Sequence, residues 1–181
     1  MIYELKNCRD GSKAVYPTTV EISENDNVLT FRFVCENSHC HCPYKGYNQL
    51  HSEGDAVELL IGTDPARRVY YEIELAPSGD SMLAKMEYLG EDENNEPILV
   101  IHFVEESFIK TSVSRTGTGY EAEISFNKNS IFTGDGEIYF NAYRLDTDGV
   151  ETDRHLFALN PTMRHKFHTP EKYVLLRNYC V

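Results

Sequence analysis

The densest group of reactive side chains lies early in the chain, where cysteines and histidines alternate. Thiolate and imidazole are the ligands that zinc prefers, and four of them can complete a tetrahedral site. The spacing Cys35-x4-Cys40-x-Cys42 differs from the CxxC knuckle, however, and no second pair follows at finger distance. One interpretation is a metal site and the other is a structural loop after a strand that ends at Cys35. The metal candidates are Cys40, Cys42, His39 and His41, together with Cys35 and His51.

A second group, basic and aromatic, lies near the carboxyl end. Guanidinium and imidazole donors beside an aromatic ring suit a polyol, and a carboxylated or phosphorylated sugar would suit them better. The alternative is a solvated face whose cations balance neighbouring Asp and Glu side chains. This group consists of Arg154, His155, Phe157, Arg164, His165, Lys166, Phe167 and His168.

Other motifs give little support to catalysis. The chain contains no GxSxG elbow and no phosphate-binding glycine loop, and no two of its many glutamates are singled out as a glycosidase pair. Asp146-x-Asp148-Gly149 resembles part of a calcium loop, but Glu151 and Asp153 miss the EF-hand spacing, which favours a hairpin turn. The acidic run 91–96 is interpreted as a solvated hairpin tip, with weak calcium binding as the alternative. The sequence therefore predicts a protein that is not an enzyme.

In the segments that must position these residues, apolar and polar side chains alternate with a period of two. Turn-forming residues separate the alternating segments, and the only helical turn that we expect covers 127–132. About ten short strands with this spacing predict an all-β fold, an antiparallel β-sandwich of the jelly-roll or immunoglobulin-like kind. We expect one domain over residues 1–181, with Phe31, Phe33 and Phe103 in its core. The predicted strands are 18–22, 28–35, 56–61, 69–75, 82–88, 98–104, 120–126, 137–144, 154–159 and 173–177.

Charge and composition exclude several classes of partner. The 181 residues include 17 basic and 29 acidic side chains, and the net charge of −12 disfavours nucleic acid and anionic membranes. The hydrophobic fraction of 41 %, with 12 tyrosines and 9 phenylalanines, is enough for a packed core, and no apolar run approaches the ~20 residues of a membrane span. The first residues lack a secretory pattern and the five cysteines are an odd number. We therefore expect a cytoplasmic protein, or alternatively a domain excised from a secreted parent.

Several of the predicted strands resemble, in order, those of family 9 carbohydrate-binding modules, which are DOMON-like β-sandwiches. The resemblance spans most of the chain. Its segments are 54–61 (GDAVELLI), 70–79 (YYEIELAPSG), 120–124 (YEAEI), 140–144 (FNAYR), 160–162 (NPT) and 167–173 (FHTPEKY).

This resemblance implies a sugar held between two aromatic rings, with carboxylate, guanidinium and amide groups around the rim. Glu58 falls on the family's hydrogen-bonding glutamate, Phe167 near one clamp ring and Arg154 near an arginine donor. The chain has no Trp, and the second clamp position falls at His51-Ser52, so His51 or Tyr47 must supply the opposite wall. The ligand-binding residues implied in this way are Tyr47, His51, Glu58, Glu74 (where the family has an arginine), Tyr143, Arg154, Phe167 and His168.

The sequence thus predicts a non-catalytic domain that binds the end of a mono- or oligosaccharide and is linked to polysaccharide catabolism. We expect no cofactor beyond a structural Ca²⁺ or Zn²⁺ ion. One alternative is a metal-binding protein or enzyme centred on the Cys/His loop 35–51. The other is a protein-interaction module that keeps the sandwich and has lost sugar binding.

Overall fold

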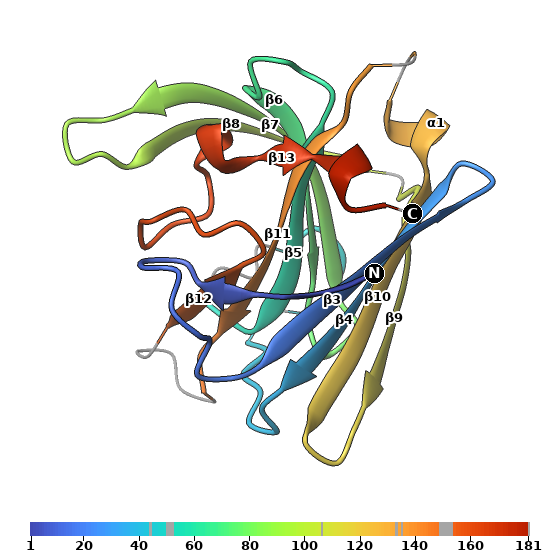
Figure 1. The fold of residues 1–181 in the computed structure, drawn as a ribbon, viewed down its shortest axis with the longest axis vertical. Helices are drawn as coiled ribbons and strands as arrows, with labels where there is room; N and C mark the ends of the chain where they lie inside the picture. Colours follow the sequence, from blue (N-terminus) through green and yellow to red (C-terminus); the bar gives the residue numbers. More distant parts are fainter. Residues whose placement is uncertain are drawn as a thin grey trace.

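Two antiparallel sheets make up the structure, which is a computed structural model (Figure 1). It describes residues 1–43, 45–49, 53–105, 107–132, 134, 136–148 and 154–180. Within these ranges thirteen strands are present, three of them only two or three residues long. The predicted all-β sandwich is confirmed.

The first sheet has five strands in the order β1-β3-β4-β10-β9. Its central strand β4 pairs along its whole length with β3 on one side and with β10 on the other. Buried residues alternate with accessible ones along β4, so one face of this sheet is buried and the other is solvated. The strands are β1 (Ile2–Glu4), β3 (Thr18–Asn25), β4 (Val28–Glu36), β9 (Lys110–Arg115) and β10 (Gly119–Asn127).

The second sheet has eight strands in the order β2-β12-β11-β5-β6-β7-β8, and β13 pairs with β11 beside this path. All seven residues of β5 are buried, which shows that the centre of this sheet is covered on both faces. The strands are β2 (Lys6–Asn7), β5 (Ala56–Gly62), β6 (Val69–Leu75), β7 (Ser81–Glu91), β8 (Pro97–Phe103), β11 (Tyr139–Asp146), β12 (His155–Ala158) and β13 (Val174–Leu175).

Helical structure is confined to three short turns. The helix α1 (Lys128–Ile131) begins where the Asn127 side chain accepts a hydrogen bond from the amide of Asn129, and it confirms the helical turn expected over 127–132. Two 3-10 turns, η1 (Pro170–Lys172) and η2 (Leu176–Asn178), flank β13. The strand predicted over 173–177 is therefore reduced to two residues. No helix in the described residues is long and apolar enough to cross a membrane.

The main core lies between the two sheets. The inward residues of β4, such as Phe31 and Phe33, meet those of β5 and β11, such as Leu59 and Phe140. Phe103, expected in the core, is 45 % exposed because it lies at the end of the edge strand β8. The edge position leaves its side chain without a covering layer.

A second apolar cluster lies on the other face of the eight-stranded sheet. It joins outward residues of β5, β6, β7 and β11 to Phe167 and Tyr173, which belong to the segment after β12. This segment, residues 159–173, crosses the outer face and forms a third layer over part of the sheet. The centre of the outer face is therefore shielded from water, and the polar groups at that centre, such as Glu58 and Asn141, are buried.

Candidate functional site

Three glutamates come together on this covered face. Strand pairing places Glu58 of β5 directly opposite Glu74 of β6, and Glu72 lies two residues before Glu74 on the same face. One carboxylate oxygen from each of the three lies within 4.8 Å of the others. Each side chain is only 3–4 % exposed. This glutamate cluster (Glu58, Glu72 and Glu74) is the only group of three acidic, thiol or imidazole residues close enough to share an ion that was found among the described residues.

The alternation of the strands explains why these residues point outward. Val57 and Leu59 on β5, and Ile73 on β6, face the main core, so Glu58, Glu72 and Glu74 must face the other way. Carboxylates in such a place lose hydration and repel one another. Burial, and then the charges of Glu74 and Glu72, raise the pKa of Glu58 well above its ordinary value. This raised pKa favours the protonated form of Glu58, which can donate a hydrogen bond as well as accept one.

A chain of polar groups leads from the glutamate cluster to the covering segment. Nε2 of His168 lies 3.4 Å from a carboxylate oxygen of Glu72, and Nδ1 of His168 lies 2.8 Å from the hydroxyl of Tyr70. Burial raises the pKa of the Tyr70 hydroxyl, so this hydroxyl stays protonated. His168, predicted as part of a polar rim, thus lies beside the glutamate cluster. Glu72 and Tyr70 were not predicted, although the alternation of β6 places them on the same face as Glu74.

Phe167 and Tyr143 do not form an open platform. The ring of Phe167 is 9 % exposed and stacks on the ring of Tyr143, with centroids 4.4 Å apart. The Tyr143 hydroxyl donates to the carbonyl of Phe167 at 3.0 Å and accepts from the Asn141 amide at 2.9 Å. The prediction of Phe167 as an exposed stacking ring is therefore wrong for this structure. The Phe167 ring fills the space between the covering segment and β11, and the Tyr143 ring packs against it there.

Tyr47 is the predicted aromatic residue that remains accessible, with 36 % of its surface exposed. Its hydroxyl donates to the carbonyl of Val104 at 2.8 Å. The neighbouring Asn48 holds the loop to the start of β7, because its side chain accepts from the amide of Leu83 and its own amide donates to the carbonyl of Ser81. Met82, next to these contacts, pairs with Glu74 across the strands. Tyr47 thus belongs to the end of the sheet where β5 begins and β6 ends. His51, the alternative wall, lies outside the described residues.

The basic group of the sequence is divided by the fold. Arg164 and Lys166 both bind the carboxylate of Glu91, the latter at 3.0 Å, while His168 lies at the glutamate cluster. Arg154, predicted as a rim donor, is exposed and lines a different pocket with His155 and His165. The structure therefore does not join Arg154 to the residues around Glu58.

The Cys/His loop does not assemble a metal centre within the described part of the chain. Cys35 is buried in the main core, and the Cys40 thiol accepts a hydrogen bond from the guanidinium of Arg115 at 2.7 Å. Nδ1 of His39 lies 3.8 Å from a carboxylate oxygen of Asp148. Burial raises the pKa of both Cys40 and Cys42, which disfavours the thiolate form that binds zinc. The described residues therefore do not bring His39, Cys40, His41 and Cys42 together as one group of metal ligands, and His51 lies outside the described residues.

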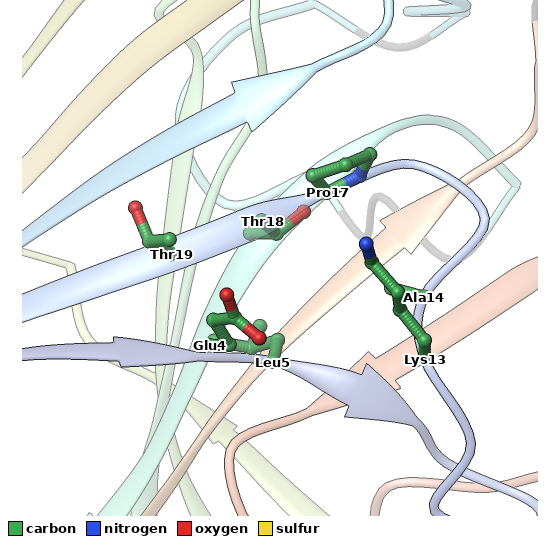
Figure 2. Close-up of a pocket in the computed structure, with 7 residues that line it drawn as sticks. All are labelled: Glu4, Leu5, Lys13, Ala14, Pro17, Thr18 and Thr19. Carbon is green, nitrogen blue, oxygen red and sulfur yellow. The ribbon is translucent and has the colours of Figure 1, made fainter.

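The residues expected in a hairpin turn after β11 are engaged in structural contacts. Asp146 forms a buried ion pair with Arg144 between the sheets, and it accepts a hydrogen bond from Asn37 at 3.1 Å. Figure 2 shows another hollow, between β1 and β3, which includes Glu4, Lys13 and Thr19. Its volume of about 90 Å³ is far below the roughly 300–1,000 Å³ of ligand pockets. Neither feature competes with the glutamate cluster as a site for an organic ligand.

Comparisons with known proteins identify the fold. No family model matches the sequence, and no curated protein matches it. A solved structure of a proposed carbohydrate-binding protein from Bacteroides uniformis is similar, with a TM-score of 0.71 at 14 % identity over 97 % of this chain and 84 % of that one. A family 9 carbohydrate-binding module from Caldicellulosiruptor kristjanssonii is also similar at 12 % identity. Its complex with glucose gives a TM-score of 0.55, over 96 % of this chain and 82 % of that one, and its complex with cellotriose gives 0.57, over 94 % and 80 %. The chain therefore has the fold of a family 9 carbohydrate-binding module.

Proposed function

We propose that this protein is a non-catalytic carbohydrate-binding domain whose site is the outer face of the eight-stranded sheet around the glutamate cluster. The observation that carries the proposal is the gathering of Glu58, Glu72 and Glu74 beside tyrosine and histidine side chains on that face. Three like-charged groups in a buried place are unfavourable for folding alone, and such groups concentrate at functional sites. The similar structures bound to glucose and cellotriose support the same function.

The chemistry of the cluster suits vicinal hydroxyl groups. A carboxylate accepts two hydrogen bonds side by side, and a protonated Glu58 supplies a donor, so the cluster can match hydroxyls that both donate and accept. His168 and Tyr70 add further polar atoms at the edge of the cluster. The exposed ring of Tyr47 is the proposed surface for the apolar C–H face of a pyranose. Because the cluster is buried, the sugar must displace part of the cover to reach it.

The proposal is tested by isothermal titration calorimetry with glucose and cellotriose on the wild type and on Glu74→Gln. The exchange keeps the size of the side chain and removes its charge. A hydrogen bond to a charged group contributes about 1.5–3 kcal/mol, so we expect the affinity to fall roughly 10- to 100-fold.

Glu123→Gln is the matched control, because Glu123 lies on the solvated face of the five-stranded sheet. This variant is expected to bind as the wild type does. Equal affinities for wild type and Glu74→Gln would contradict the placement of the site. Absence of any heat or melting shift with either sugar at millimolar concentration would overturn the carbohydrate proposal, and the retained sandwich would then favour a protein-interaction module.

A further inference from the structure

A separate pocket lies at the β2–β12 edge of the eight-stranded sheet, away from the proposed sugar site. The two strands pair there through Asn7 and Phe157, and the segment that follows β12 returns over them (Figure 1). The pocket has a volume of about 200 Å³. Its described lining consists of Asn7, Arg9, Arg154, His155, Leu156 and His165. None of these residues belongs to the glutamate cluster.

The lining is basic in a protein whose net charge is −12. Two guanidinium groups and two imidazoles border the pocket, and its described lining contains no carboxylate. The nearest acidic partners recorded for these groups lie outside it: Asp10 follows Arg9 in the chain, and Asp148 interacts with His155. On a surface with so many acidic side chains, a cation without a function is expected to lie beside a carboxylate. A pocket whose described lining holds several cations and no carboxylate therefore indicates a site for an anion.

The contrast with neighbouring basic residues sharpens this point. Arg164 and Lys166, on either side of His165, are both neutralised by Glu91. Within the described residues Arg9, Arg154 and His165 form no ion pair. The charges around His165 are positive: burial, and then Arg9, Arg154 and His155, lower the pKa of His165. An anion that lies among these cations relieves this mutual repulsion.

The donors match a small tetrahedral anion. Each guanidinium presents parallel N–H groups that bind phosphate or sulfate oxygens in pairs, and the imidazoles add single donors. The pocket is smaller than the roughly 300–1,000 Å³ that holds an organic ligand, so it fits the anionic group and not a whole sugar. A polyanion such as nucleic acid would also meet the acidic remainder of the surface.

We propose that the pocket between β2, β12 and residue 165 binds one tetrahedral oxyanion, phosphate or sulfate, either as the free ion or as a monoester. The two arginines hold the oxygens in pairs and the two histidines complete the shell. The pocket would allow the domain to recognise a phosphorylated or sulfated molecule in addition to a neutral sugar. It rests on different residues from the sugar site, so either function can fail without the other.

The test is titration calorimetry of the full chain with inorganic phosphate, inorganic sulfate and, at the same ionic strength, chloride. We expect phosphate and sulfate to bind and chloride not to bind. The double variant Arg9→Gln/Arg154→Gln is expected to lose at least about tenfold in affinity, because two bidentate contacts are removed. Arg177→Gln is the control, because Arg177 is not part of the pocket lining and pairs with Glu137. This variant should leave anion binding unchanged.

Two further measurements distinguish the source of the anion and its mode of binding. Methyl phosphate, a monoester without a sugar, identifies a monoester site if it binds more tightly than inorganic phosphate, and equal affinity identifies the free ion; both results support the pocket. Sulfate keeps its charge over the pH range in which histidine titrates, so its affinity should fall as the pH rises through the lowered pKa of His165, because that imidazole then loses its proton. The proposal is overturned if neither anion binds, or if the double variant binds as well as the wild type.

Discussion

The outer faces of the two sheets carry similar acidic residues in opposite surroundings. On the five-stranded sheet, Glu121 and Glu123 of β10 are partly solvated, and Arg32 of β4 binds Glu121 at 2.7 Å. On the eight-stranded sheet, Glu58 and Glu74 are almost completely buried. The first face has the ordinary character of an antiparallel sheet that meets water. The second face has a third layer over it.

This difference shows that burial beneath the covering segment, and not the residue type, makes a glutamate a candidate site residue. The covering segment contributes Phe167 and Tyr173 to the apolar cluster and His168 to the polar chain. It removes water from the glutamates, which raises the pKa of Glu58 and strengthens every hydrogen bond nearby. On the open face of the five-stranded sheet, the glutamates keep their contact with water, so their hydrogen bonds are not strengthened in this way. The predictions below test this contrast with variants that remove the cover, the ionisable group of Glu58 or the exposed ion pair.

Removing the cover should have the largest effect. Phe167→Ala deletes a buried ring that stacks on Tyr143, and such substitutions reduce the free energy of unfolding by about 3–5 kcal/mol. For a chain of this length each kcal/mol corresponds to about 2–4 °C in Tm. Thermal and urea unfolding measure the loss. Phe103→Ala, at an exposed position of the same sheet, is the control and should change stability by about 0.5 kcal/mol or less. Equal losses in the two variants would show that the segment does not cover the face in solution.

Removing the ionisable group of Glu58 should have a smaller effect of opposite sign. The pKa of Glu58 is raised in the folded protein, so the folded state binds more protons than the unfolded chain above about pH 4.5. The stability of the wild type therefore falls as the pH rises from there toward the folded pKa. Each unit of the pKa difference corresponds to about 1.4 kcal/mol.

Glu58→Gln cannot ionise and should escape this loss, so we expect its Tm to exceed that of the wild type by a margin that grows with pH. Glu123→Gln, from the open face, supplies the comparison and should change the melting temperature little at any pH. Parallel profiles for wild type and Glu58→Gln would mean that Glu58 is not held in its protonated form.

The sequence was sufficient for the sandwich because alternation is strong in its long strands. Val69–Leu75 was predicted with the observed bounds, and the strand predicted over 56–61 extends by only one residue. Short edge strands such as β1 and β2 were missed because two or three residues contain no periodic pattern. β9 was missed because its sequence, KTSVSR, is polar and lies at a sheet edge. A strand can be predicted from its sequence when it is long enough and when its two faces differ clearly in hydrophobicity.

The candidate site was predicted only in part, for a different physical reason. Glu58, Glu74 and His168 were singled out and lie together, and alternation alone could have added Glu72. The burial of Phe167 could not be predicted, because it depends on where an irregular segment crosses the sheet. The division of the basic group has the same origin: Arg154 and His168 are close in sequence, but β12 and the turn after it carry them to different places. Periodicity assigns a residue to a face, and only the tertiary path of the chain decides what covers that face.

The smallest effect should follow from breaking the exposed ion pair of the open face. Arg32→Ala removes the contact with Glu121, in which the Arg32 side chain is half exposed. Water and salt screen such pairs, and we expect Tm to change by about 1 °C or less, with even this difference disappearing at high salt. A double-mutant cycle with Glu121→Ala isolates the coupling between the two side chains. A coupling that persists in high salt would mean that this face is also shielded from water, and the contrast between the two sheets would then have to arise from something other than the covering segment.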